Sequence, residues 1–184
     1  MVVIWIVLAV VVVVLLWVMV SFNRLVRLRN EADQGYSSID IQLKRRADLI
    51  PNLVETVKAY AAHERGVFDD VSEARSRTLS AGSVGDAVEA ERQMRGALGR
   101  LFAVAEAYPQ LRASENFREL QEELSDTEDK IAAARRYYNT VVQAYNTGQQ
   151  TFPASAVAGT FGFSPREFFR LEDDGDRAPV AVSV

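Results

Sequence analysis

The sequence predicts an all-α protein, in which a single N-terminal transmembrane helix precedes an antiparallel up-and-down four-helix bundle. Three observations carry this prediction. The first twenty residues contain no charged side chain, and the chain beyond them repeats apolar residues at spacings of three and four, the period of an amphipathic helix. Between residues 23 and 150, proline occurs only at positions 51 and 109, so long stretches are free of helix breakers.

Residues 1–22 are expected to form the transmembrane anchor. A helix rises ~1.5 Å per residue, so twenty residues extend over roughly 30 Å, the thickness of the hydrocarbon core of a bilayer. Trp5 and Trp17 lie near the two ends of the run, where amphipathic rings favour the headgroup region. The competing interpretation is a cleaved signal peptide, but no basic residue precedes Arg24 and no A-x-A cleavage pattern follows the run.

Three arginines follow the apolar run at once, namely Arg24, Arg27 and Arg29. Basic residues beside one end of a membrane span indicate that this end faces the cytoplasm. We therefore expect a single-pass protein of the bacterial cell (inner) membrane, with a short N-terminus outside and the C-terminal domain in the cytoplasm. The chain contains no cysteine, which excludes disulfides and thiolate catalysis.

Residues 23–150 are expected to form the antiparallel helical bundle. Four apolar stripes predict its helices: Leu25, Leu28, Ala32, Tyr36, Ile39 and Leu43; Leu53, Val57, Tyr60, Val67, Val71 and Ala74; Met94, Leu98, Leu101, Phe102 and Ala105; Phe117, Leu120, Leu124, Ile131, Tyr138, Val141 and Tyr145. Ser83 and Ser114 are candidate N-caps, and the Tyr108–Pro109 step predicts a helix end.

Pro51 leaves two interpretations of the first part of the bundle. Proline is tolerated in the first turn of a helix and disrupts a helix interior. Asp48 could cap a helix that begins at residue 49, so we expect a break near residues 46–50, which gives four soluble helices. The alternative is one long helix that kinks at Pro51, which gives three. In the four-helix arrangement, the last long helix returns toward the bilayer.

Beyond the bundle, five of the nine phenylalanines lie between residues 152 and 169, separated by small residues. Residues 151–170 are expected to cap one end of the bundle; the alternative is a contact with lipid, a second copy or another protein. Residues 171–184 are acidic and then irregular, which predicts a flexible tail.

Several segments together resemble the LemA family. They are QLKRRADLIPNLV at 42–54, AEAYPQL at 105–111, ENF at 115–117, TE at 127–128, ARRYYN at 134–139, YN at 145–146, FP at 152–153 and FGF at 161–163. The apolar span followed by FNRLV at 22–26 fits the family too. The resemblance covers nearly the whole chain except the tail. It implies a membrane-anchored antiparallel helical bundle, and it implies no reaction.

Signals for catalysis or cofactors are weak. His63 is the only histidine, and position 67 holds valine, where the zinc-protease pattern H-E-x-x-H needs its second ligand. The acidic residues between 119 and 129 favour a solvated helix face over a divalent-ion site. No phosphate-binding loop and no basic stripe interleaved with aromatics occurs. We predict no enzyme activity, cofactor, metal, nucleic acid or small-molecule substrate.

The candidate structural or interaction residues are polar residues on or beside the apolar stripes, together with two phenylalanines of the C-terminal segment. They are Arg46, Asp48, Asn52, Glu106, Glu128, Arg135, Asn139, Asn146, Phe161 and Phe163. A buried charge is costly unless it is paired, so we expect the polar members to pair with one another and fix the helix register. The alternative is a ligand or partner site.

The sequence therefore predicts a non-enzymatic membrane protein whose cytoplasmic helical bundle, or coiled coil, serves as a scaffold or adaptor. Its expected partners are the lipid bilayer and either another protein or further copies of the chain, bound through the soluble bundle. The apolar run has no G-x-x-x-G pattern for helix dimerisation. The alternatives are a homo-oligomeric assembly that shapes membranes or responds to stress, and an accessory factor of a membrane enzyme such as a protease.

Overall fold

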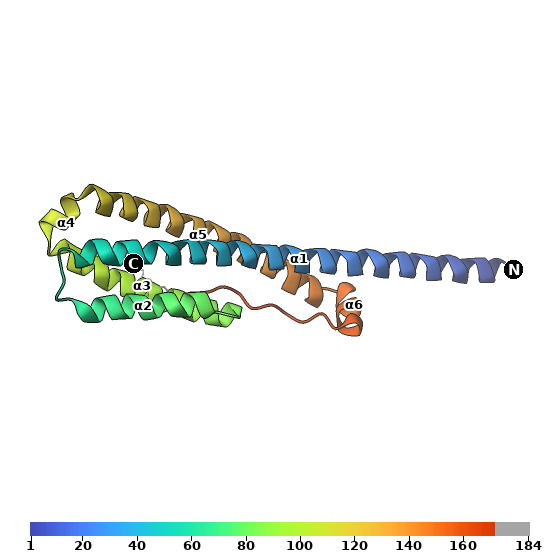
Figure 1. Ribbon diagram of the computed structural model, residues 1–184. Coiled ribbons are helices and arrows are strands. Elements are labelled where there is room, and N and C mark those ends of the chain that lie inside the picture. Colours follow the sequence, from blue (N-terminus) through green and yellow to red (C-terminus); the bar gives the residue numbers. More distant parts are fainter. Residues whose placement is uncertain (172–184) are drawn as a thin grey trace, which may run out of the picture. The chain divides into compact units, whose positions relative to one another are not determined.

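The computed structural model describes residues 1–171, and these contain helices and no strand, which confirms the predicted all-α fold class. The helices are α1 (Val2–Lys58), α2 (Arg65–Ser80), α3 (Val84–Glu106), α4 (Pro109–Ala113), α5 (Glu115–Gln150) and α6 (Ala154–Phe161) (Figure 1). The predicted flexible tail lies outside the described residues, apart from residue 171.

The chain divides into two compact units, and α1 and α5 contribute to both. The first unit comprises Met1–Gln42 and Glu128–Phe168. The second comprises Leu43–Thr127 and, among the described residues, 169–171. Each unit has its own buried residues, and we describe them separately.

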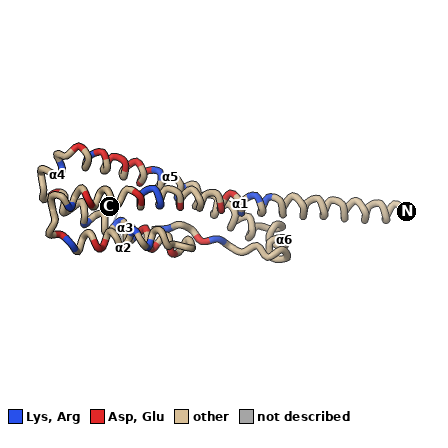
Figure 2. The backbone as a smooth tube through the Cα atoms, viewed as in Figure 1, with Lys and Arg blue, Asp and Glu red and all other residues tan. Residues whose placement is uncertain are grey.

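The N-terminal part of α1 has the character of a membrane span. One 18-residue window of this helix has a mean hydropathy of 3.3, and none of it is buried by the protein. Figure 2 shows this stretch without a charged residue and with basic residues directly after it, which in the sequence are arginines. By length and composition the helix is able to cross a bilayer.

The rest of the first unit pairs α1 with the second half of α5 in antiparallel directions. Gly148 of α5 lies beside Leu25 of α1, whereas Tyr138 of α5 lies beside Gly35. A Cβ atom on Gly35 would come within 3.3 Å of the Tyr138 Cα atom, so glycine permits the close approach of the two backbones. Members of the first and fourth apolar stripes are buried here, including Leu25, Ile39 and Tyr145.

The second unit holds a four-helix core. Side chains of α1, α2, α3 and α5 form one buried cluster, to which α4 adds Leu111 (Figure 1). The second and third stripes supply many of these residues, including Leu53, Val71 and Met94. Tyr60 is the exception, with 44% of its surface exposed, because the chain has left helix α1 at that point.

The predicted break near residues 46–50 is wrong, because α1 continues through Pro51 to Lys58. Proline has no N–H group, so the carbonyl oxygen of Ala47, four residues earlier, lacks its helical donor. In the structure, Arg75 Nε of α2 donates to this oxygen at 2.8 Å. A neighbouring helix thereby satisfies the group that Pro51 leaves unpaired, and the helix is not interrupted.

The chain breaks instead between Ala59 and Glu64, so four long helical segments still arise. The backbone N–H of Tyr60 donates to the Val57 carbonyl at 3.0 Å, a short-range bond of the kind that tightens the last turn of a helix. Ala61 is buried in the core directly afterwards. No glycine or proline marks this turn, and the sequence pattern therefore did not indicate it.

The two predicted N-caps and the predicted helix end before Pro109 are confirmed. Ser83 accepts a hydrogen bond from the Asp86 backbone N–H at 3.1 Å and caps α3. Ser114 accepts from the Phe117 N–H at 3.3 Å at the start of α5. Helix α3 ends shortly before Pro109, which itself begins the short helix α4, an element that the sequence analysis did not anticipate.

Candidate functional site

The candidate residues divide between the two units. Arg46, Asp48, Asn52 and Glu106 belong to the second unit; Glu128, Arg135, Asn139, Asn146, Phe161 and Phe163 belong to the first. A polar network in the core requires buried side chains, and of these ten residues only Arg46 is fully buried.

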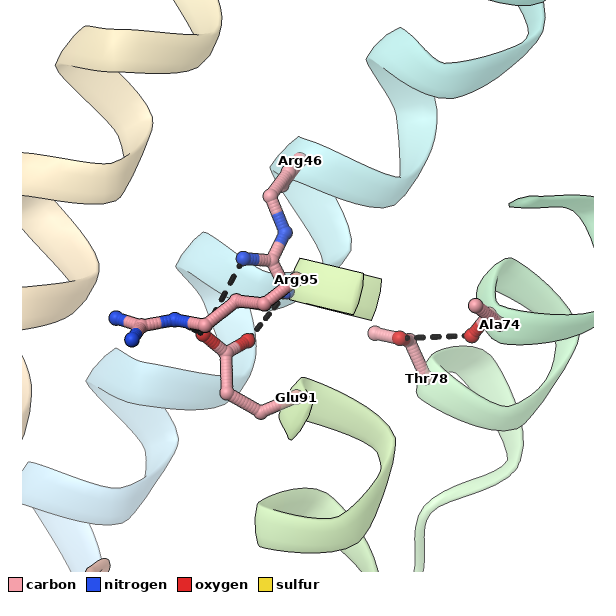
Figure 3. Close-up of polar contacts among 5 residues, drawn as sticks. All are labelled: Arg46, Ala74, Thr78, Glu91 and Arg95. Atoms are coloured by element: carbon pink, nitrogen blue, oxygen red, sulfur yellow. Dashed lines mark hydrogen bonds and ion pairs between the residues drawn. The ribbon is translucent and has the colours of Figure 1, made fainter. Parts of the chain in front are cut away.

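Arg46 forms a fully buried ion pair with Glu91 of α3 (Figure 3). Both side chains have no exposed surface, and Arg46 Nη1 lies 3.3 Å from Glu91 Oε1. Arg95, one turn further along α3, donates to the same carboxylate from Nε at 3.1 Å. The pair and its hydrogen bonds join α1 to α3 inside the core, out of reach of any ligand in solution.

The other candidates of the second unit are not in its core. Asp48, Asn52 and Glu106 are all exposed. Arg46 therefore pairs with a residue outside the predicted set. Glu91 was missed although its position offered a signal, because it lies four residues after Ala87 and three before Met94, in step with the apolar stripe of α3.

Residues 163–170 form a non-helical C-terminal segment. Asn146 holds this segment against α5. Its side-chain amide donates from Nδ2 to the Arg166 carbonyl at 2.9 Å and accepts from the Arg166 N–H at 2.9 Å. Tyr138 Oη donates to the Glu167 carbonyl at 2.8 Å. The Arg166 side chain reaches Asp33 of α1 at 2.7 Å. These contacts fix a non-helical backbone that has no ladder partner of its own.

Burial shifts the pKa of two tyrosines of α5, Tyr138 and Tyr145. It raises the pKa of Tyr138 above the ordinary value of 10.0, and the nearby Arg166 guanidinium partly opposes the shift. Burial likewise raises the pKa of Tyr145. Both phenols therefore stay protonated at neutral pH. Glu128, Arg135 and Asn139, which lie on the same helix, are half-buried.

The two candidate phenylalanines pack on the start of the polar part of α1. The rings of Phe161 and Phe163 lie 5.0 and 5.6 Å from the Phe22 ring, both in edge-to-face geometry. The Arg29 guanidinium lies 5.7 Å from the centre of the Phe163 ring, within the range of a cation–π contact. Phe161 remains 55% exposed. The aromatic cluster therefore lies two residues beyond the end of the apolar run.

A recess of about 390 Å³ adjoins this cluster within the first unit. Its walls include Trp17, Ser21 and Arg24 from α1, and Thr147 and Thr151 from α5. Phe152, 83% exposed, stands at its edge. Trp17 is predicted from the sequence as an interfacial ring, but no sequence pattern connects it with residues 147–154. That pairing depends on how α5 packs against α1.

The acidic residues and the histidine that the sequence singled out can all be located in residues 1–171. No group of three or more histidine, aspartate or glutamate side chains in this part of the chain is arranged to hold a metal ion. The acidic residues of α5 that the sequence singled out are exposed, and one of them, Glu123, pairs with Arg45 at 3.4 Å. His63 is exposed in the turn between α1 and α2.

Comparison with known proteins places the chain in a family. The family model of LemA matches residues 35–184. The magnetosome protein MamQ of Magnetospirillum gryphiswaldense is 26% identical over 192 residues, which cover 90% of this chain and 71% of the relative. MamQ 2 of Paramagnetospirillum magneticum is 27% identical over 184 residues, covering 86% of this chain and 68% of the relative.

The protein LemA of Metamycoplasma hominis is 30% identical over 138 residues, which cover 74% of this chain and 63% of the relative. We call residues 23–171, the described chain after the predicted anchor, the helical body. The family match includes most of this body and all the candidate residues. The all-α fold, the sequence segments and the family match agree, and the chain belongs to the LemA family.

Proposed function

We propose that this protein is a non-enzymatic, single-pass membrane protein that presents its helical body as a scaffold or adaptor for membrane or protein partners. The observation that carries the proposal is that α1 contains both the apolar run and residues of the folded core. One unbroken helix supplies an uncovered apolar run of membrane-spanning length and one wall of a four-helix core. A helix of this kind ties a folded domain to a bilayer.

A binding role is favoured over catalysis because the buried charged groups are paired and closed to solvent. The one fully buried pair that we describe, Arg46 with Glu91, is closed to solvent and bridges two helices. An active site needs titratable groups in an accessible cleft. Neither the family description nor the names of the relatives mention a reaction.

We place the body on the cytoplasmic side of the inner membrane. Arg24, Arg27 and Arg29 lie within the first turns after the apolar run and are all exposed. The positive-inside rule assigns the arginine-rich side to the cytoplasm.

Site-specific photo-crosslinking in native membranes tests the scaffold role. Four exposed apolar or aromatic side chains of the body are suitable positions: Ile41, Tyr60, Leu79 and Tyr137. We expect a defined cross-linked product from at least one of them, and a matched probe at the exposed Glu89 serves as a control. A body that presents no binding surface would give no product at any of the four positions.

The identity of the product separates the alternatives. Products of twice the chain mass that contain only this chain would favour the homo-oligomeric assembly. A product with a membrane protease or other membrane enzyme would favour the accessory role. Purified full-length protein that converts a substrate would contradict the non-enzymatic proposal.

A further inference from the structure

We propose that the recess bounded by Trp17, Ser21, Arg24, Thr147 and Thr151 binds the headgroup of an anionic phospholipid. This inference rests on the proposed membrane anchoring and adds a ligand to it. The recess belongs entirely to the first unit, and its walls come from the end of the apolar run and from the C-terminal turns of α5.

The depth of the recess matches that of lipid phosphates. Helix α1 rises ~1.5 Å per residue, so Arg24 lies roughly 6 Å beyond Val20, the last residue of the run. A bilayer is ~40–45 Å thick with its headgroups and has a hydrocarbon core of ~30 Å, which leaves about 5–7.5 Å of headgroup region on each side. Trp17 lies within the last turn of the run. The recess therefore extends across the boundary between acyl chains and headgroups.

The three arginines after the run differ in what they contact. Arg27 Nε lies 3.9 Å from Glu31, and Arg29 lies over the Phe163 ring. Arg24 lines the recess, and no ion pair to it occurs within residues 1–171. A guanidinium group offers parallel N–H donors that match two phosphate oxygens, so Arg24 is the group suited to hold a phosphodiester.

The other walls favour a lipid over a free ion. Trp17 and the 83% exposed Phe152 supply apolar rings beside the charged group, which suits a ligand with a phosphate at one end and acyl chains at the other. None of the side chains lining the recess, all within the described residues, is acidic. The cationic amine of a zwitterionic headgroup thus finds no carboxylate there, and a lipid with net negative charge is preferred.

The recess is formed by the way α5 ends. Gly148 packs so closely on α1 that a Cβ atom there would lie 3.4 Å from Leu25 Cδ2. Two residues after α5 ends, the chain turns at Phe152–Pro153, and the Ser155 N–H donates to the Thr151 carbonyl at 3.0 Å. The close packing and the turn border the recess, which Thr147 and Arg24 both line.

Tryptophan quenching in reconstituted bilayers tests the proposal with the full-length chain. In a Trp5→Phe background, Trp17 is the only tryptophan. Vesicles contain phosphatidylglycerol and phosphatidylcholine, with brominated acyl chains on one lipid at a time. We expect brominated phosphatidylglycerol to be about fivefold enriched at Trp17, which corresponds to about 1 kcal/mol per basic residue near an anionic surface.

Two variants and a matched control locate the effect. Arg24→Gln is expected to abolish the enrichment, whereas Arg27→Gln, which removes the same charge one turn away outside the recess, should retain most of it. Thr147→Phe keeps Arg24 and fills the recess, and it should also abolish the enrichment. Equal losses in Arg24→Gln and Arg27→Gln would show only a diffuse charge attraction and would overturn the proposal.

Two further outcomes keep the inferences apart. If inorganic phosphate at millimolar concentration removed the enrichment, the recess would be a general phosphate site and the lipid assignment would be wrong. If neither brominated lipid quenched Trp17, the membrane anchoring itself would be wrong. Equal quenching by both lipids in the Trp5→Phe background would leave the anchor in place and overturn the lipid site alone.

Discussion

At the scale of single residues, the buried pair of Arg46 and Glu91 has the largest expected effect on stability. Two charges without exposed surface are tolerated because each neutralises the other and because Arg95 adds a further hydrogen bond. Removing one partner leaves the other as an uncompensated charge in the core. Replacing both by apolar residues removes the charge problem altogether.

We expect Glu91→Ala to lower the free energy of unfolding by about 3–5 kcal/mol. The double variant Arg46→Met, Glu91→Leu should recover most of this loss. Glu89→Ala is the matched control, since Glu89 forms an exposed pair with Arg92 on the same helix and should change stability by less than about 0.5 kcal/mol. Chemical denaturation of the full chain in detergent, followed by circular dichroism, measures all three. Similar losses for Glu91→Ala and Glu89→Ala would contradict the burial.

Tyr138 makes stability depend on alkaline pH. Burial raises the pKa of the folded phenol above 10.0, so the unfolded chain ionises first as the pH rises. The stabilisation that the neutral phenol of Tyr138 contributes is complete below about pH 10 and is lost as the pH rises through its raised pKa. We expect Tyr138→Phe to cost about 0.5–1.5 kcal/mol at pH 7, through the lost hydrogen bond to Glu167, and to flatten the decline above pH 10. Denaturation midpoints between pH 7 and 11 measure this, with the exposed Tyr60→Phe as control.

At the scale of elements, the path of α1 through Pro51 depends on α2. The Ala47 carbonyl loses its helical donor to Pro51 and gains Arg75 Nε instead. Pro51 and Arg75 should therefore be energetically coupled, although they are 24 positions apart in sequence. A helix that tolerated Pro51 without this support would show no such coupling.

A double-mutant cycle measures that coupling. We expect Arg75→Ala to cost about 1–3 kcal/mol, because it leaves a half-buried carbonyl without a partner. In the Pro51→Ala background the same change should cost roughly 1 kcal/mol less, since the new N–H of residue 51 can donate to Ala47. Arg77→Ala removes an exposed pair with Glu73 and serves as the control. Additive effects within about 0.3 kcal/mol would refute the explanation.

The C-terminal segment is an element whose order comes from side chains of α5. We expect Asn146→Ala to accelerate amide exchange at Arg166 by about tenfold or more, because the N–H loses its acceptor and the carbonyl its donor. Hydrogen exchange read by mass spectrometry on the peptide over residues 163–170 reports this. Gln143→Ala, an exposed position on the same helix, should leave the exchange rate unchanged.

At the scale of the whole molecule, the anchor and the family assignment rest on different residues. The LemA family model begins at residue 35, whereas the apolar run ends at residue 20. The physical properties of the run therefore have to establish its role. The proposed orientation rests on the three arginines that follow the run.

The absence of cysteine provides a clean test of orientation. A single cysteine introduced as Ser80→Cys, at an exposed position of the body, should resist a membrane-impermeant maleimide in intact spheroplasts and react after lysis. A cysteine at Val2 should react in intact spheroplasts. Replacing Arg24, Arg27 and Arg29 by glutamine should give a mixed population. Labelling of Ser80→Cys without lysis, in a chain that keeps its arginines, would reverse the proposed topology.

The sequence by itself determined the all-α class, the apolar run, both ends of α3 and the start of α5. Each of these follows from local chemistry: uncharged length for the run, spacing of three and four for the buried faces, and Ser83, Ser114 and Pro109 for the ends. The stripes also identified most of the core, because burial follows periodicity whatever the partner helix is.

The tertiary structure decided the features that depend on a partner distant in sequence. Pro51 does not break α1 because Arg75 supplies the missing donor, and Arg46 is paired because Glu91 faces it from α3. The recess beside Trp17 exists because the end of α5 packs against α1. Helical periodicity specifies which face of a helix is buried, but the contacts that satisfy a buried polar group form only when the helices pack together.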